Sequence, residues 1–392
     1  MGHAMSAQVD GGPPDRGSPP PIALAGSGRQ RGRIHGESLR ETIHEAVDRW
    51  RRELANELGS PVDEYLAALV GETSFERAIS RRTPDLLDEV EGIAEGAGID
   101  RATMVAFQLV DEDWWFRRNR RLGIRPPASL KCSALAFGGR GQDAPVVAEN
   151  LDIPKWSDGL QTLLRVQRPS GDEALVFSYA GMIGLTGVNS SGVGVCVNSL
   201  IQLDTRTDGL PVAFVLRGIL ECSSLEEAAR FVRDVDHASG QSYLIGGARG
   251  VAAFECSARG ATQLRASGDG RGLCHTNHPL VCQDTAIFDA VQRLEDPERL
   301  RRSRLNSECR LDCLQRSLDS NPAPGRAVDD AKRALRSHDG DYPVCCHNVK
   351  DRAWFTAWSV IYELADPPVA HFTCGPPCRS DYRTDGFGGR RE

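Results

Sequence analysis

The chain has 392 residues, which is enough for one large domain or two ordinary ones. Its composition, 40% hydrophobic and 26% charged, is that of a globular protein. A net charge of −7, from 47 basic and 54 acidic residues, argues against a nucleic-acid binder. The sequence has neither an apolar run of the ~18 residues that a membrane-spanning helix needs nor a secretion signal, so we expect a cytoplasmic protein without a membrane partner. Twelve cysteines in so long a chain are interpreted mostly as reduced thiols.

The first third of the chain divides into a tail and a helical region. Residues 1–33 are rich in Gly, Pro, Ser and Arg, and we predict that they form a disordered tail. Ser38 and Glu41 have the spacing of a capping box and predict a first amphipathic helix. A second helix is expected through Tyr65 and Leu69, and a third between Pro84 and Gly98. Residues 34–131 are therefore predicted to be mostly helical.

From residue 132 the sequence is dominated by short strand-like runs between Gly-rich turns. These runs are CSALAF, PVVAEN, LQTLLRVQ, EALVFSYA, VGVCVNSLI, QSYLIGG, VAAFECS, PVCCHNV, WFTAWSVIYEL and VAHFTC. Helices are expected at 211–220, 225–235, 284–294, 300–318 and 327–335. Because strands and helices follow one another without a regular β-α-β rhythm, we predict an α+β fold with mainly antiparallel sheets.

Cys132 stands where the helical region meets the first strand. A cysteine at a strand start is most often a small buried hydrophobe, so this residue alone indicates little. Other runs follow it, including ENLD at 149–152, GVNSSGVGV at 187–195, HTNHPL at 275–280 and a terminal CGPPC. The ordered set, over about residues 32–378, resembles the acyl-coenzyme A:6-aminopenicillanic acid acyltransferase family of cysteine N-terminal-nucleophile hydrolases.

The resemblance implies a four-layer αββα sandwich and a precursor that cuts its own chain before Cys132. Lys131 and Cys132 would flank the cut, although the family usually has a small residue at the first of these positions. Residues 34–131 would form the α subunit and residues 132–392 the catalytic β subunit. No cofactor and no metal are expected, and a higher oligomer is compatible with the family.

The chemistry of such a site follows from ordinary acidities. A free α-amino group has a pKa near 7.7–8.0 and a thiol one near 8.5, so a terminal amine accepts the proton of the thiol on the same residue at neutral pH. In the uncut chain that nitrogen is an amide and is not basic. Backbone cleavage is therefore expected to activate the nucleophile.

The resemblance assigns roles to four further residues. Asn277, in HTNH, matches the asparagine that stabilises the oxyanion, and Asp152 matches the aspartate that orients the new amine. Asn189 is a second oxyanion candidate, although a turn asparagine explains its Gly-Val-Asn-Ser-Ser-Gly context slightly better. Arg352 is a candidate for a cation in the site, and a solvated arginine is an equally good interpretation.

We therefore expect an enzyme that hydrolyses or transfers the acyl group of a small-molecule amide through an acyl-Cys132 intermediate. An N-acyltransferase that uses an acyl thioester is the alternative within the family. Two other classes stay open: an unprocessed binding protein, and a metal-binding protein suggested by Cys345-Cys346-His347 and by the cysteine pairs 374/378 and 309/313. The absence of any CxxC makes structural zinc the less favoured interpretation.

Overall fold

Two β-sheets form the centre of the molecule. The computed structural model describes residues 19–119, 132–139, 143–168, 170–265, 272–291, 296–319, 325–349 and 353–388. In these ranges, an eight-stranded sheet has the order β1-β4-β5-β6-β7-β8-β9-β10 and a six-stranded sheet the order β11-β2-β3-β12-β13-β14. Every pairing between these strands is antiparallel except that of β1 with β4. The mainly antiparallel α+β fold predicted from the sequence is confirmed.

The bounds of the strands match most of the predicted runs. The first sheet consists of β1 (Ile22–Leu24), β4 (Gln161–Gln167), β5 (Glu173–Tyr179), β6 (Thr186–Asn189), β7 (Gly194–Ser199), β8 (Gln241–Gly247), β9 (Gly250–Ser257) and β10 (Gly260–Leu264). The second consists of β11 (Leu273–His275), β2 (Ser133–Phe137), β3 (Val146–Pro154), β12 (Trp354–Glu363), β13 (Val369–Cys374) and β14 (Arg383–Gly386).

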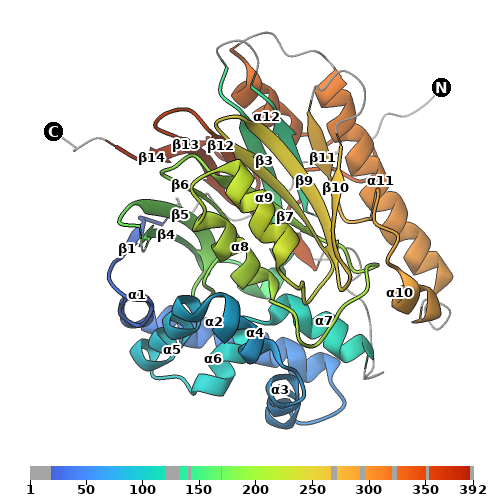
Figure 1. Ribbon diagram of the computed structural model, residues 1–392. Helices are drawn as coiled ribbons and strands as arrows, with labels where there is room; N and C mark the ends of the chain where they lie inside the picture. Colours follow the sequence, from blue (N-terminus) through green and yellow to red (C-terminus); the bar gives the residue numbers. More distant parts are fainter. Residues whose placement is uncertain are drawn as a thin grey trace.

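Helices cover the outer face of each sheet. On the first sheet lie α8 (Val212–Leu220) and α9 (Leu225–Asp234), and on the second lie α11 (Pro297–Asp319) and α12 (Ala327–Leu335). The inner faces meet where β2, β3 and β11 contact β7, β8 and β9. The contacts therefore order the layers as helix, sheet, sheet and helix, and Figure 1 shows α8 and α9 lying along their sheet.

The N-terminal helices gather at one end of these layers (Figure 1). They are α1 (Gly28–Ser38), α2 (Arg40–Glu57), α3 (Val62–Gly71), α4 (Phe75–Arg82), α5 (Pro84–Ala97), α6 (Arg101–Phe107) and α7 (Val110–Asn119), while α10 (Ala286–Val291) lies beyond β11 in the chain. Pro84 begins α5, and Gly98 ends it with a left-handed φ of 71°, as the sequence predicted.

Three local predictions made from the sequence are wrong. The tail predicted for residues 1–33 ends earlier, because β1 pairs with β4 as the edge strand of the first sheet and α1 begins at Gly28 under a capping box formed by Ser27 and Gln30. α2 begins without a side-chain cap, so the box predicted at Ser38 is absent there. The run PVCCHNV is not a strand, since these residues form an irregular loop.

α1 is a helix in spite of its glycines because they allow it to touch α5. A Cβ atom on Gly32 would come within 1.9 Å of the Glu89 carbonyl oxygen, and one on Gly92 within 2.3 Å of the Arg29 carbonyl oxygen. Each glycine weakens an isolated helix by roughly 1 kcal/mol relative to alanine. Here the close packing of two helix backbones outweighs that preference.

A buried network of charged side chains joins the N-terminal helices α1 and α5 to α8, which covers the first sheet. Glu89, on α5, accepts from Arg31 at 3.0 Å and from Arg217, on α8, at 2.7 and 3.0 Å. All three side chains are almost fully buried. Burial opposes ionisation of Glu89, but the two guanidinium groups outweigh it and hold its pKa below the ordinary 4.5.

Glu89→Gln is expected to lower the free energy of unfolding by about 3–5 kcal/mol, because it removes the carboxylate paired with the buried Arg217, while Arg31 keeps its ion pair with Asp85. Urea denaturation at neutral pH measures the loss. Glu91→Gln, on the same helix and paired with the half-exposed Arg29 and Arg101, is the control and should cost less than about 1 kcal/mol. Since the pKa of Glu89 is lowered in the fold, its contribution is complete above pH 4.5 and is lost as the pH falls through the folded value. Equal losses in the two variants would contradict the assignment.

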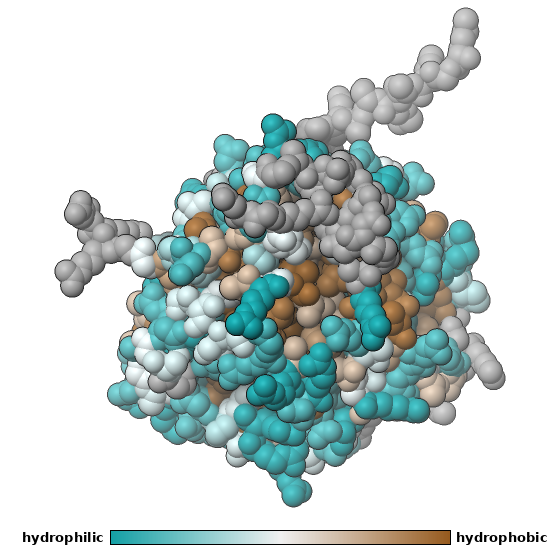
Figure 2. Space-filling view, turned by 45° about the horizontal axis from the view of Figure 1, so that its top comes forward, coloured by the Kyte–Doolittle hydropathy of each residue, from teal (hydrophilic) through white to brown (hydrophobic). Residues whose placement is uncertain are grey.

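Large hydrophobic side chains are scarce on the described surface. Figure 2 shows one face, on which hydrophilic residues surround a smaller patch of hydrophobic ones. Among the described residues, the exposed large hydrophobic side chains are Leu280, Val281 and Leu305, each 37% exposed. None of the described helices combines the length and apolar character needed to cross a bilayer.

Candidate active site

Cys132 directly precedes β2, which is an interior strand of the six-stranded sheet. β2 lies between β11 and β3, and its register pairs Ser133 with Asn150 and Ala134 with Glu149. Continuing that ladder by one residue brings Cys132 level with Leu151, beside Asp152. The sheet thus places the start of the CSALAF run next to the end of the ENLD run.

The Cys132 thiol is enclosed. The residue is 8% exposed, and its Sγ donates to the backbone oxygen of Asp152 at 3.5 Å. Burial raises the pKa of this thiol well above its usual value. The side chain is therefore a neutral thiol at neutral pH.

The Asp152 carboxylate is fixed by a neighbouring strand. Its Oδ1 accepts from the Thr356 hydroxyl at 2.6 Å, and Thr356 lies opposite Asp152 in the pairing of β3 with β12. Along β3, Glu149 contacts Val197 of the first sheet while Asn150 contacts the loop after α12. The alternation of a strand therefore turns Asp152 to the same side as Asn150, toward the helices.

Asn277 reaches the same end of the sheet from the other side of β2. β11 pairs His275 with Ala134, so the antiparallel ladder brings Asn277 to the level of Cys132. The Asn277 side chain is buried, and its Nδ2 donates to the backbone oxygen of Ser199 at 3.1 Å. An amide nitrogen carries two hydrogens, so this bond orients the group and leaves it the capacity to donate a second.

Arg310, on α11, connects Cys132 to Asn277. Its Nη1 donates to the Cys132 backbone oxygen at 2.6 Å and to the Ser133 hydroxyl at 2.8 Å, and its Nη2 donates to Asn277 Oδ1 at 2.9 Å. The side chain is fully buried, and burial lowers its pKa to about 10, so it stays a cation at neutral pH. By holding Oδ1, Arg310 fixes which end of the Asn277 amide is the donor.

Arg310 was not predicted from the sequence. Six arginines lie on α11, and the packing of this helix over β2 and β11 distinguishes the buried one. The predicted cation, Arg352, and the residue before the predicted cut, Lys131, lie outside the described residues.

A pocket opens beside Cys132 and Asp152, with an empty volume of about 670 Å³. Most of its lining is apolar and includes Trp114, Leu151, Ile153, Met182, Leu216 and Trp354. Asp111 is a carboxyl group in the same lining, and burial raises its pKa to about 6. The pocket therefore offers an apolar cavity with a carboxylate that is mostly ionised at neutral pH.

Asn189, like Asn277, is not among the residues that line this pocket, and its hydrogen bonds distinguish it from Asn277. Its Nδ2 donates to the Leu220 and Cys222 backbone oxygens at 2.8 and 2.7 Å, and its Oδ1 accepts from Val193 N at 2.9 Å. The amide oxygen thus closes the turn between β6 and β7, and the amide nitrogen ties that turn to the C-terminal end of α8. The structure favours the turn interpretation, and we do not assign Asn189 to the site.

The neighbouring histidines also have structural partners. His275 Nε2 lies 2.8 Å from Glu255 Oε1, and His278 Nδ1 lies 2.7 Å from the Ser307 hydroxyl. Glu255 in turn accepts from the backbone nitrogens of residues 280, 281 and 282. These bonds shape the HTNHPL turn that carries Asn277.

Comparison with known proteins now gives the family. The model of the family described as acyl-coenzyme A:6-aminopenicillanic acid acyl-transferase matches residues 140–375, more than half of the chain. The chain belongs to this family. A curated relative, the 40 kDa form of acyl-coenzyme A:6-aminopenicillanic-acid-acyltransferase from Emericella nidulans, is 26% identical over 261 residues, which cover 66% of this chain and 69% of the relative.

Two solved structures show a weaker similarity. A mutant of the conjugated bile acid hydrolase from Clostridium perfringens has 11% identity and a TM-score of 0.40, over 66% of this chain and 97% of that chain. Penicillin V acylase from Agrobacterium tumefaciens has 15% identity and a TM-score of 0.37, over 62% and 82% of the two chains.

Proposed function

We propose that this member of the acyltransferase family is a self-processing cysteine amidohydrolase or acyltransferase that forms an acyl-enzyme on Cys132. The observation that carries the proposal is that Cys132 and Asp152 line an apolar pocket, while Arg310 bonds both the Cys132 backbone oxygen and the Asn277 amide. The relative from Emericella nidulans, named as an acyltransferase, supports the same reaction class. The N-terminal-nucleophile type of the αββα fold is part of this proposal.

The first step is the cut between Lys131 and Cys132. The Cys132 sulfur attacks the Lys131 carbonyl carbon, the C–N bond breaks, and the freed nitrogen takes up the thiol proton. Water then hydrolyses the thioester to a Lys131 carboxylate and a Cys132 thiol. The residues through 131 become the α subunit, and residues 132–392 become the β subunit.

The second step uses the new amine as the base. Cys132 Sγ attacks the carbonyl of a bound amide, the α-amine accepts the proton of the thiol, and Asn277 donates to the developing oxyanion. The Asp152 carboxylate keeps the amine oriented. The leaving amine departs with a proton from the ammonium group, and the acyl-Cys132 is released to water or to an acceptor amine.

The pocket lining indicates the class of substrate. Apolar side chains such as Leu151, Met182 and Leu216 suit an aliphatic or aromatic acyl group, and the Asp111 carboxylate suits a polar or cationic end. An acyl thioester presents the same acyl group on a better leaving group. An N-acyltransferase that uses a thioester donor is therefore the second candidate.

The two subunits are expected to stay together after the cut. β1 contributes a strand to the eight-stranded sheet, and Glu89 of the α subunit is bonded to Arg217 of the β subunit. Both pieces should therefore elute together in gel filtration and separate only in denaturant.

Acid-quenched mass spectrometry tests the proposed reaction. The purified protein is mixed with an N-acyl amide or with an acyl thioester that carries an apolar acyl group, and the β subunit is digested. We expect the acyl mass on the peptide that begins at Cys132, and product formation with water or with an added amine separates hydrolysis from transfer. Turnover with the acyl group on any other residue would overturn the proposal.

A further inference from the structure

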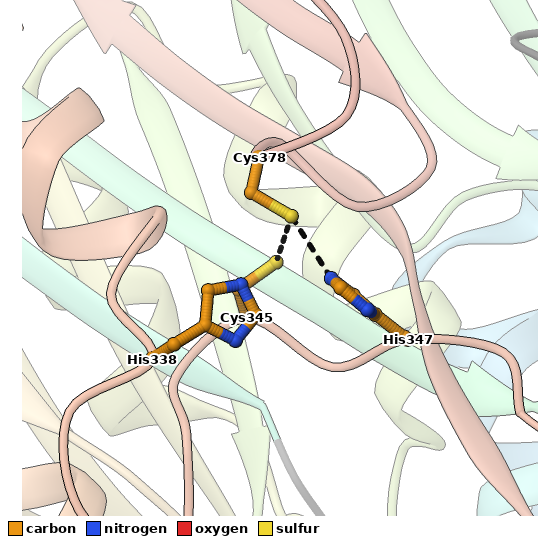
Figure 3. A group of neighbouring side chains, drawn as sticks. All are labelled: His338, Cys345, His347 and Cys378. Atoms are coloured by element: carbon orange, nitrogen blue, oxygen red, sulfur yellow. Dashed lines mark hydrogen bonds between the residues drawn. The ribbon is translucent and has the colours of Figure 1, made fainter. Parts of the chain in front are cut away.

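A second cluster of reactive side chains lies outside the candidate active site. His338, Cys345, His347 and Cys378 each offer one ligand atom, and all four atoms lie within 4.8 Å of one another. The two sulfur atoms are 3.5 Å apart, and His347 Nε2 is 2.9 Å from Cys378 Sγ. Figure 3 shows the four side chains converging from separate parts of the C-terminal region.

We propose that this cluster is a structural zinc site with a Cys2His2 ligand set. With Zn–S bonds of about 2.3 Å and Zn–N bonds of about 2.0–2.1 Å, a tetrahedral ion requires ligand atoms roughly 3.3–3.8 Å from one another. The separation of the two sulfurs falls in that range. Small rotations of the side chains would bring the distances between the other ligand atoms into it. Two thiolates and two neutral imidazoles also balance the charge of Zn²⁺.

The backbone already holds the first three ligands in place. Cys345 N donates to the Ser337 carbonyl oxygen at 3.1 Å, which brings the residue after Ser337, His338, next to Cys345. Asn150 Nδ2 donates to the backbone oxygens of Leu335 and Val344, at 2.8 and 3.1 Å. The ligand loop is therefore closed on itself and fixed to β3.

The fourth ligand comes from the segment after β13, and Arg336 holds it. Arg336 Nε donates to the Pro377 carbonyl oxygen at 2.8 Å, and its Nη2 donates to the Ser380 carbonyl oxygen at 3.2 Å. These carbonyls lie on the two sides of Cys378. A preorganised set of four protein ligands leaves no coordination position open, which is typical of structural zinc rather than of catalytic zinc.

The cluster is connected to the candidate active site through Cys346. This residue lies between two of the ligands, and it makes two hydrogen bonds with Thr356: Cys346 N donates to Thr356 Oγ1 at 3.0 Å, and Thr356 N donates to the Cys346 oxygen at 2.9 Å. The Thr356 hydroxyl donates to Asp152. The metal would thus stabilise the loop that positions Thr356, the hydrogen-bond partner of Asp152. It would take no part in the reaction itself.

Binding releases two protons, because both cysteines coordinate as thiolates: Zn²⁺ replaces the thiol hydrogens, and no oxidant or reductant is involved. A disulfide between Cys345 and Cys378 is the competing outcome. Formation of that disulfide would remove two electrons and two protons from the two thiols, and it would abolish the metal site. This inference departs from the expectation that the chain has no metal, and it does not depend on the proposed function.

Elemental mass spectrometry on the full chain, purified without a histidine tag in a reducing buffer, tests the site. We expect about one zinc per chain and, after chelation and reloading with Co²⁺, the absorption of a tetrahedral cobalt–thiolate site. Cys378→Ser should lower the metal content at least about tenfold, since it removes one of four ligands. Cys374→Ser, a cysteine four residues earlier that is outside the cluster, should keep it.

If the Cys378→Ser variant does not fold, removal of zinc from the wild-type protein with a chelator tests the site instead. Removing zinc from the wild-type protein should lower its melting temperature, and adding Zn²⁺ back should restore it. Reduced protein that holds no zinc and takes up none on titration would overturn the inference. A Cys345–Cys378 disulfide in the freshly purified chain, or a Cys374→Ser variant that loses the metal equally, would do the same.

Discussion

Cys132→Ala is expected to leave the purified protein as one uncut chain and to reduce amide hydrolysis and acyl transfer by roughly 10⁴- to 10⁶-fold. The substitution removes the sulfur that attacks both the Lys131 carbonyl and the substrate. Because the side chain is 8% exposed and small, the change to alanine should leave the fold intact. Intact mass and initial rates are measured on the same preparation.

Cys309→Ala is the matched control for this variant. Cys309 is a half-buried cysteine on α11, and it contributes to neither the proposed site nor the zinc cluster. The Cys309→Ala protein should be cut before Cys132 and should turn over substrate as the wild-type protein does. An uncut Cys132→Ala protein with undiminished turnover would rule out Cys132 as the nucleophile.

Asn277→Ala is expected to lower kcat by roughly 10²- to 10³-fold with a much smaller effect on KM, because the amide donates to charge that exists only in the transition state. The cut before Cys132 passes through a similar oxyanion and should slow as well. Steady-state kinetics on the cut fraction and the time course of cutting measure the two effects.

Asn189→Ala separates the two asparagines that the sequence offered. Its amide makes three backbone hydrogen bonds in a turn, so this variant should lose about 1–3 kcal/mol of stability for the groups left unpaired. The kcat of the folded fraction should change little. A reversed pattern, with catalysis lost at Asn189 and kept at Asn277, would contradict the roles given to the two side chains.

Local signals in the sequence predicted the elements whose ends are decided locally. Pro84 and Gly98 set the ends of α5 through their backbone geometry, and the run of β12 is rich in the aromatic and β-branched residues that are enriched in strands. Cys132, Asp152 and Asn277 lie at one level of the sheet because the strands that carry or adjoin them, β2, β3 and β11, are adjacent and their pairing registers align these positions. Their grouping was expected from the family resemblance, since single-residue patterns do not specify strand order.

Long-range packing decided the features that the sequence did not reveal. β1 is a strand of three residues that forms because it pairs with β4. α1 is stable because its glycines allow its backbone to pack closely against that of α5. The sequence suggested metal binding from Cys345-Cys346-His347 and the cysteine pair 374/378, but not that the turn after β13 brings Cys378 back to the loop that carries Cys345. Each of these depends on contacts between residues at least 31 positions apart in the chain, for example His347 with Cys378.

The mass of the purified, denatured protein tests the central claim most directly, before any substrate is known. We predict two pieces, of which the larger begins with Cys132 and extends to the C-terminus. A single chain that carries all 392 residues and still turns over an acyl amide would contradict activation by a freed Cys132 amine.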